Sequence, residues 1–163
     1  MAETIHLALK ANGTDIKGQS TQTSLERADT IECVSFEYGV VTAREAGSGI
    51  ATGRRQHMPL VIKKRIDSAS PLIIKALCEN QVIEGVFKFY RPAQIGDGTT
   101  EQFYTVAIKK GRVNSVKQHV EHSKQAGQSP DVPMEEVSFV FHTITWTFEE
   151  GGVTHEDTWD KQS

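Results

Sequence analysis

Only one stretch of this chain has the residue spacing of an α-helix, and it follows directly after a strand-like segment. From Leu72 to Cys78 the apolar residues recur at three- and four-residue spacings, which gives a helix one apolar face. Pro71 suits the first helical turn, where its missing N–H donor is not needed, and Asn80 tolerates a left-handed stop. The candidates for the N-cap are Asp67, Ser68 and Ser70.

The other patterned segments alternate in the manner of β-strands. The predicted strands are 4–11, 30–41, 60–66, 85–91, 102–109, 112–120, 136–148 and 153–159. Turns are predicted at Asn12-Gly13, 95–98, Lys110-Gly111 and Gly151-Gly152. The apolar face changes along 136–148, which indicates a strand that bends or crosses between packed layers. Many strands and one helix predict a mainly β fold, a small antiparallel barrel or sandwich.

Two predicted strands divide into faces that suggest what they contact. In 30–41, one face holds Val34, Phe36 and Tyr38, and the other holds Cys33, Ser35 and Glu37. In 85–91, Phe87 and Phe89 lie opposite Lys88 and Tyr90. We expect the more apolar face of 30–41 to lie against the core.

Between two of these strands lies a glycine-rich stretch, 43–56. Gly47, Gly49 and Gly53 make a core segment unfavourable, because glycine loses the most backbone entropy and offers no side chain to pack. The stretch predicts a long loop. Loops of this length in compact domains are generally either functional or disordered, and the sequence leaves both open.

Length and composition place the chain among ordinary soluble domains. With 163 residues it suits a single domain, 1–163, that buries about 70% of the surface its unfolded chain exposes. A net charge of −3 argues against a nucleic-acid partner bound through a basic field. No apolar run reaches the length of a bilayer span, and the first residues lack the pattern of a signal peptide. We therefore expect no membrane partner and a cytoplasmic start.

Motifs for catalysis, metals or cofactors are missing from the pattern. His119 and His122 are three apart but lack further ligands, and Cys33 and Cys78 lack metal spacing, so we expect two ordinary buried cysteines. Ser35 has no nucleophile-elbow motif around it. The glycine stretch lacks the ending of a phosphate-binding loop. We predict no enzyme, no metal site and no cofactor.

Several linked motifs resemble the Hcp proteins of the bacterial type VI secretion system. They are GQS near Gly18, IECVSFEYGV from Ile31, the glycine stretch, TGRRQHMPLVIKKRIDSASPLIIKAL, and EEVSFVFHTITW. The likeness runs from about Ile5 to Trp159, in one order. It implies a small β barrel with one flanking helix, similar to phage tail-tube proteins.

The resemblance also implies an assembly. In that family, six-membered rings stack into a secreted inner tube that a contractile sheath propels under a spike protein, with small effector proteins held in the lumen. We expect Ser35 and Glu37 to face the lumen, and Arg54 to His57 to face outward. The expected subunit or ring contacts are Arg44, Gly47, Gly49, Arg54, Arg55 and His57, unless these are plain surface residues. The short tail after Trp159 predicts a bare tube subunit without an appended domain.

Two alternatives to the tube subunit come from other functional classes. The first is a monomeric β-barrel that holds a small ligand in its interior. The second is a hydrolase with an unfamiliar Ser or His arrangement. A strictly monomeric chain would exclude the tube subunit, because a ring subunit needs two different adhesive patches.

Overall fold

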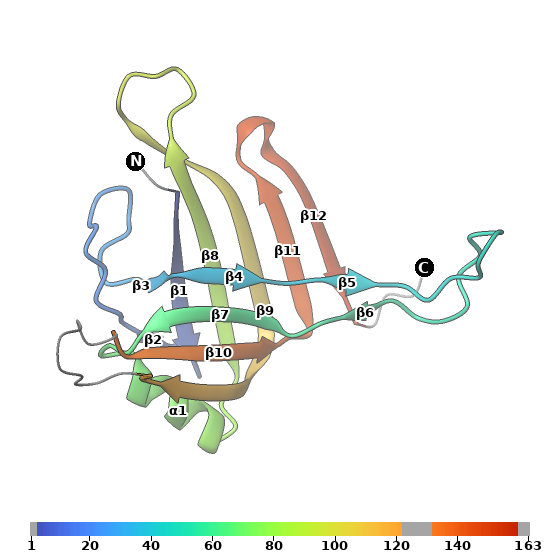
Figure 1. Cartoon of the computed structure of the whole chain (residues 1–163), viewed down its shortest axis with the longest axis horizontal. Coiled ribbons are helices and arrows are strands. Elements are labelled where there is room, and N and C mark those ends of the chain that lie inside the picture. Colours follow the sequence, from blue (N-terminus) through green and yellow to red (C-terminus); the bar gives the residue numbers. More distant parts are fainter. Residues whose placement is uncertain (1–2, 122–131, 160–163) are drawn as a thin grey trace.

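The computed structural model describes residues 3–121 and 132–159, and most of them lie in antiparallel strands (Figure 1). The first strands are β1 (Thr4–Ala11), β2 (Thr14–Ile16), β3 (Ile31–Cys33), β4 (Ser35–Glu37), β5 (Val40–Val41), β6 (Gln56–His57) and β7 (Leu60–Arg65). After α1 (Ser70–Cys78) come β8 (Ile83–Pro92), β9 (Thr100–His119), β10 (Met134–Val140), β11 (Thr143–Phe148), the short helix η1 (Glu150–Gly152) and β12 (Val153–Thr158). The mainly β fold with one flanking α-helix is confirmed. The predicted loop at 122–133 and the tail after Trp159 lie largely outside the described residues.

Two sheets cross each other and share one strand. The first contains β1, β2, β3, β8, β11, β12 and the first half of β9, and the second contains β4, β7, β10 and the second half of β9. Figure 1 shows the strands of one sheet running across those of the other. The segment 31–37 links the far ends, because β3 pairs with β1 while β4 pairs with β7. The strands thus wrap round a common core as a barrel does.

The crossing at β9 corrects one prediction. Lys110-Gly111 does not reverse the chain: β9 runs through it as one strand of 20 residues. Lys110 has a φ of 51°, and the pairing register to β8 shifts at Gly111. A Cβ on Gly111 would lie 2.7 Å from the Val140 carbonyl oxygen, so only glycine fits. The Lys110-Gly111 pair therefore marks a bulge that bends β9 from one sheet into the other.

The predicted strand 136–148 does cross between layers, as its change of apolar face indicated. It breaks at Phe141 and His142 into β10, which pairs with the second half of β9, and β11, which pairs with the first half. The Asn12-Gly13 hairpin is also confirmed, since both residues have positive φ and Ala11 pairs with Thr14.

The predicted strand 30–41 is divided at Val34, and its faces change there. Phe36 and Tyr38 pack against the core as expected, but Val34 is 62% exposed and Cys33 packs inward instead. Val34 lies between β3, which pairs with β1, and β4, which pairs with β7. The alternation of inward and outward side chains therefore breaks at this residue.

Aliphatic and aromatic side chains fill the barrel interior. Leu7, Ile62, Phe87 and Phe139 are fully buried, and Phe36 contacts Phe87 edge to face with ring centroids 5.4 Å apart. These side chains occupy the space in which a barrel-type carrier would hold a small ligand.

Part of the outer face of β1 and β8 is covered by the segment between β2 and β3. Tyr90 is fully buried and His6 is 1% exposed. The Tyr90 hydroxyl donates to the Leu25 carbonyl at 3.0 Å, and the Arg27 guanidinium lies 4.7 Å from the Tyr90 ring centroid. The His6 imidazole lies 3.0 Å from the Thr30 hydroxyl, and burial lowers the pKa of His6. The segment between β2 and β3 therefore forms a lid over this part of the sheet.

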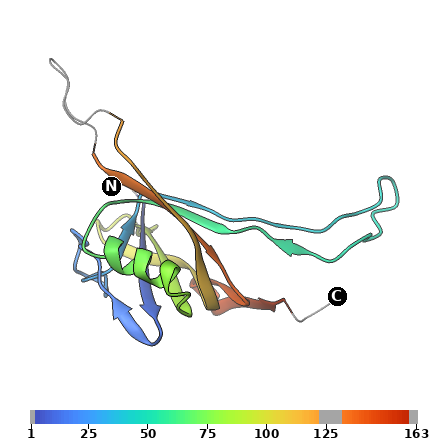
Figure 2. The same ribbon diagram turned by 90° about the horizontal axis from the view of Figure 1, so that it is seen from below.

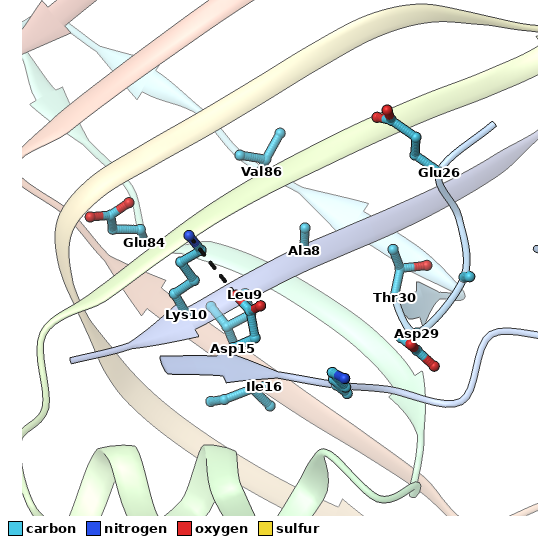
Figure 3. Close-up of a pocket in the computed structure, with 12 residues that line it drawn as sticks. Ala8, Leu9, Lys10, Asp15, Ile16, Glu26, Asp29, Thr30, Glu84 and Val86 are labelled. Carbon is cyan, nitrogen blue, oxygen red and sulfur yellow. Dashed lines mark ion pairs between the residues drawn. The ribbon is translucent and has the colours of Figure 1, made fainter. Parts of the chain in front are cut away.

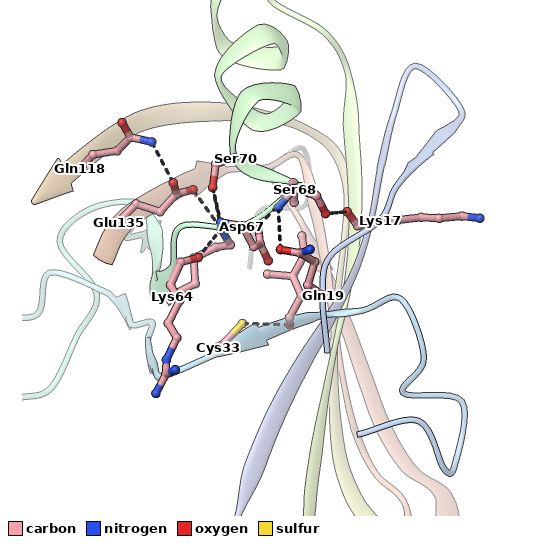
Figure 4. A network of polar contacts seen from close by, with 12 residues as sticks. Lys17, Gln19, Cys33, Lys64, Asp67, Ser68, Ser70, Gln118 and Glu135 are labelled. Carbon is pink, nitrogen blue, oxygen red and sulfur yellow. Dashed lines mark hydrogen bonds and ion pairs between the residues drawn. The ribbon is translucent and has the colours of Figure 1, made fainter. Parts of the chain in front are cut away.

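Helix α1 begins on a buried ionic network instead of a side-chain cap. The residue at its N-cap is Ala69, with no side-chain cap hydrogen bond, so the predicted caps are wrong. The fully buried Lys64 ammonium donates to Asp67 at 2.9 Å, to Ser70 at 3.2 Å and to Glu135 at 3.1 Å (Figure 4). The predicted stop is confirmed, because Asn80 has a φ of 51°. Among the described residues no helix is long and apolar enough to cross a bilayer.

The two cysteines differ in their surroundings. Cys33 is half-buried, and burial raises the pKa of its thiol to about 12, which keeps it protonated and unreactive. Cys78 is exposed at the end of α1, so the expectation that both are buried is wrong for Cys78. Both are free thiols.

Candidate functional site

The glycine-rich stretch forms a two-stranded arm that projects from the second sheet (Figure 2). Val40 pairs with His57 and Val41 pairs with Gln56, which continues β4 and β7 outward as β5 and β6. Farther out, the Thr52 amide donates to the Ala43 carbonyl at 2.8 Å, and an isolated bridge joins Arg44 and Ala51. The predicted long loop is therefore an extended hairpin arm, 40–57.

The arm reverses through two glycines. Gly47 and Gly49 have φ values of 95° and 75°, and a Cβ on either would meet no atom within 4 Å. Backbone conformation, and not space, therefore requires glycine at both positions. The Arg44 guanidinium donates to the Gly49 carbonyl at 3.0 Å and holds the tip closed.

The root of the arm is fixed to the last strand by a charged contact. The Arg55 guanidinium donates two hydrogen bonds of 2.7 Å to the Asp157 carboxylate and one of 3.2 Å to the Thr158 carbonyl. Such a bidentate pair fixes orientation as well as distance. The arm therefore leaves the body in a direction set by β12.

His57 completes this root. Its Nε2 lies 2.7 Å from Asp157 Oδ2, the oxygen that also accepts from Arg55 Nε, and its Nδ1 lies 2.6 Å from the Tyr38 hydroxyl. The carboxylate can only accept, so Nε2–H donates to Asp157 and Nδ1 accepts from the Tyr38 hydroxyl. The imidazole also contacts Phe141 and Trp159, with ring centroids 5.5 and 5.4 Å apart.

The electrostatics set the protonation of Asp157 and Tyr38 in this network. Hydrogen bonds from Arg55 lower the pKa of Asp157 to about 2, against the opposing effect of burial and with a further contribution from His57. Burial raises the pKa of Tyr38, and the Asp157 charge raises it further. At neutral pH Asp157 is therefore charged and Tyr38 keeps its proton, as the hydrogen bonds require.

Hydroxyl, imidazole and carboxylate lie in the order found in hydrolytic triads, but their setting differs. The His57 side chain is 2% exposed and is enclosed by aromatic rings, so it cannot reach a substrate. The raised pKa of Tyr38 also opposes its use as a nucleophile. In the described ranges 3–121 and 132–159, no three His, Cys, Asp or Glu side chains gather to hold a metal ion.

The predicted contact residues divide between the arm and its root. Arg44, Gly47, Gly49 and Arg54 are exposed on the arm, while Arg55 is half-buried at the root. The expectation that residues through His57 face outward is wrong for His57, because Asp157 and Tyr38 hold it inside. Asp157 lies in the short polar strand β12, and no local pattern marks it as a partner of the arm.

The predicted lumen residues lie on the outer face of the second sheet. Ser35 and Glu37 are both exposed on β4 and alternate with the inward Phe36. Strand register extends them into two rows. One row consists of Ser35, Lys63, Glu136 and Lys117. The other consists of Glu37, Val61, Ser138 and Ser115. Four strands thus present a mainly polar wall, in which Val61 is apolar and Ser138 is only 6% exposed.

Comparison with known proteins gives matches over most of the chain. The family model described as "Type VI secretion system effector, Hcp" matches residues 9–148. A relative from Pseudomonas aeruginosa (strain PAO1), named "Major exported protein", is 32% identical over 132 residues, 80% of this chain and 76% of the relative.

Solved structures agree in fold. A double mutant of the Hcp1 protein from E. coli EAEC 042 has a TM-score of 0.77 and 28% identity, covering 97% of this chain and 99% of its own. The secreted protein Hcp3 from Pseudomonas aeruginosa has a TM-score of 0.76 at 22% identity, covering 98% and 100%. Because the family model and the Pseudomonas relative both span most of the sequence, the chain belongs to the Hcp family of type VI secretion system proteins.

Proposed function

We propose that this chain is a tube subunit of a type VI secretion system. Six copies form a ring, and rings stack into an inner tube that is exported from the cytoplasm. The sheath and the spike protein are its partners in that machine, and small effector proteins occupy the lumen. Family membership and the projecting arm support this proposal.

The exposure of the arm is the observation that carries the proposal. Val40, Val41, Ile50 and Met58 are 44%, 54%, 63% and 54% exposed, along a hairpin with no core of its own. An isolated two-stranded hairpin is at best marginally stable in water. Clustered apolar side chains on a projecting element mark a surface that another protein covers.

The polar wall of the second sheet supports the lumen part of the proposal. Its exposed side chains include charges of both signs, Lys63, Lys117 and Glu136, beside Ser35. A wall of this kind can hold soluble cargo by many weak polar contacts without gripping it irreversibly. We propose that Ser35 and Glu37 belong to this cargo-facing surface.

The interior of the barrel argues against the small-ligand alternative. Fully buried side chains such as Leu7, Phe87 and Phe139 occupy it. A small molecule could enter only by displacing packed core residues, each worth several kcal/mol.

Solution mass and negative-stain microscopy test the ring. We expect particles of six subunits that lengthen into stacks at high concentration. Shortening the arm between Gly47 and Gly53 should impair assembly and leave the β circular-dichroism signal unchanged. A wild-type chain that stays monomeric at every concentration would refute the proposal.

Cargo retention tests the wall separately. Glu37→Phe should change the amount of effector that co-purifies with intact rings, because it replaces a carboxylate by a bulky neutral group. Glu101→Phe, on another part of the surface, is the control. Equal retention by both variants across several effectors would remove Glu37 from the cargo surface.

A further inference from the structure

The segment 17–30, which we call the lid, is closed at its neck and lies on the outer face of the first sheet. At the neck the Gly18 amide donates to the Asp29 carbonyl at 2.9 Å. A Cβ on Gly18 would lie 2.5 Å from the Thr30 carbonyl oxygen, so the two ends of the lid touch. A loop whose ends meet in this way can open locally while the strands on either side stay in place.

The lid has an unfavourable backbone and buries few side chains. Leu25, Glu26 and Asp29 have φ values of 55°, 62° and 60°, in the left-handed region that residues other than glycine seldom adopt. Most lid side chains are exposed. A hollow of about 430 Å³ lies between Glu26 and Thr30 of the lid and Ala8 of β1 (Figure 3). A small number of polar and aromatic contacts therefore holds the lid closed.

His6 on β1 makes two of those contacts from beneath the lid. The Thr30 hydroxyl has one proton and donates it to the Arg27 carbonyl at 2.7 Å. Towards His6, whose Nδ1 lies 3.0 Å away, the Thr30 oxygen can therefore only accept, so Nδ1 carries a hydrogen. The His6 ring also contacts the Tyr90 ring edge to face, with centroids 5.5 Å apart.

The other ring nitrogen of His6 has no partner. Nε2 is buried, and no described residue forms a hydrogen bond with it. In the tautomer that Thr30 requires, Nε2 carries only a lone pair. Protonation would turn Nε2 into a donor that lacks an acceptor, and it would place a full charge on a side chain that is 1% exposed.

The charges around His6 add to this picture. Burial has the largest effect on the pKa of His6 and lowers it, Glu32 on β3 raises it, and Arg27 on the lid lowers it again. The Glu32 Oε1 atom already accepts from the Thr21 amide at 2.7 Å and from the Thr21 and Ser20 hydroxyls at 2.6 and 3.2 Å. The other charged or titratable groups on the elements around the ring are Lys88 and Tyr90 on β8, and Glu26 and Asp29 on the lid. Of these, Lys88 and Glu26 pair with each other at 3.5 Å. The site therefore favours a neutral histidine.

We propose that the lid is acid-sensitive: neutral His6 holds it closed, and uptake of a proton by His6 releases it. An imidazolium leaves its buried site only if the lid lifts from β1 and β8 and admits water. Lifting also uncovers the Tyr90 ring, which is fully buried while the lid is closed. The outer face of the first sheet thereby gains an exposed aromatic side chain in acid. The switch uses contacts within one chain and does not depend on the proposed function.

The closed lid should lose stability as the pH falls, because only the open form binds the proton easily. With the lid open, His6 has the ordinary histidine pKa of 6.5, and with the lid closed its pKa is lower. The closed lid is therefore most stable above about pH 6.5 and is weakened below it. Uptake of one proton limits the rise in the opening equilibrium to about ten-fold between about pH 7.5 and pH 5.5.

Hydrogen exchange of the lid amides tests the switch, after correction for the intrinsic pH dependence of exchange. In the wild type, lid opening should increase about five- to ten-fold from about pH 7.5 to pH 5.5, with the β10 amides as an internal reference. His6→Asn keeps a donor near the Nδ1 position without a titrating ring. His6→Phe keeps a ring against Tyr90 without a proton site. Both variants should make lid opening independent of pH in this range.

His119→Asn is the matched control, because it removes an exposed histidine from β9 and should keep the wild-type response. Wild-type lid opening that does not change with pH would overturn the proposal. An equal pH response in the wild type, His6→Asn and His6→Phe would also overturn it, because the proton would then act elsewhere. The comparison concerns the pH response, so a lid that opens more readily at every pH in one variant does not affect the result.

Discussion

The Arg55 guanidinium and the Asp157 carboxylate lie 2.7 Å apart although 102 positions separate them in the sequence. This contact joins the root of the arm to the last strand, and His57 adds a third hydrogen bond to the same carboxylate. A projecting hairpin without a core is thereby given a fixed direction. The contact makes Asp157 a positioning residue for the proposed assembly surface.

Asp157→Asn should lower the free energy of unfolding by about 1–3 kcal/mol, because it weakens charge-assisted hydrogen bonds in a site that is largely buried. Urea unfolding at one fixed protein concentration measures the change. Hydrogen exchange of the arm amides should accelerate at the same time. Glu101→Gln removes the charge from a more exposed pair with Arg91 and should cost under about 1 kcal/mol. Equal losses in the two variants would contradict a special role for Asp157.

The same carboxylate predicts a dependence on pH. The pKa of Asp157 is lowered to about 2 in the folded protein, from an ordinary value of about 3.9. Its contribution to stability is therefore complete above about pH 4 and is lost as the pH falls towards 2. Wild type should lose its advantage over Asp157→Asn across this window, in urea unfolding at pH 5, 3 and 2. A constant difference would show that the carboxylate charge is not the cause.

Lys64 should be intolerant of truncation. Lys64→Ala leaves Glu135, whose side chain is fully buried, and Asp67 without their cation, which should cost about 3–5 kcal/mol. Lys63→Ala, one residue earlier on the exposed face of β7, should change stability by about 0.5 kcal/mol or less. Chemical unfolding of both variants checks the contrast. Similar losses would mean that the network contributes little to stability.

Gly111→Ala should destabilise the protein by about 1–3 kcal/mol, because the new Cβ would meet the Val140 carbonyl oxygen at 2.7 Å where β9 bends. Gly53→Ala offers a matched substitution on the arm, since its Cβ would lie 3.7 Å from the Ala43 Cβ, an ordinary contact. Thermal unfolding should show a lower midpoint for the first variant only. An unchanged midpoint for Gly111→Ala would contradict the close approach at the bend.

Local signals were reliable where the backbone itself decides the structure. Asn12-Gly13 closes a hairpin, and Asn80 ends α1 with a positive φ, because few other residues adopt that conformation easily. The Lys110-Gly111 pair carries the same kind of signal yet only bends β9. Whether such a pair reverses or bends a strand depends on the strands beside it, and these come from distant parts of the chain.

The polar side chains near the arm show that local sequence patterns do not predict which charged or polar groups are buried. Arginine and histidine beside a glycine-rich stretch suggest an exposed surface, and this holds for Arg44 and Arg54. His57 is buried because Asp157 supplies a charge for its Nε2–H and aromatic rings close over it. The N-cap candidates fail for a similar reason, since Ser70 and Asp67 hydrogen-bond the Lys64 ammonium.

The sequence alone determined the class of fold, the existence of one helix, most of the strands and, through its linked motifs, the family. These depend on periodicity and on residues close together in the chain. Only the tertiary structure decided that the glycine-rich stretch becomes an arm, where β9 bends and which charges are buried. Those features depend on pairings such as Arg55 with Asp157 and Lys64 with Glu135, and a side chain far away in the sequence leaves no mark on local spacing.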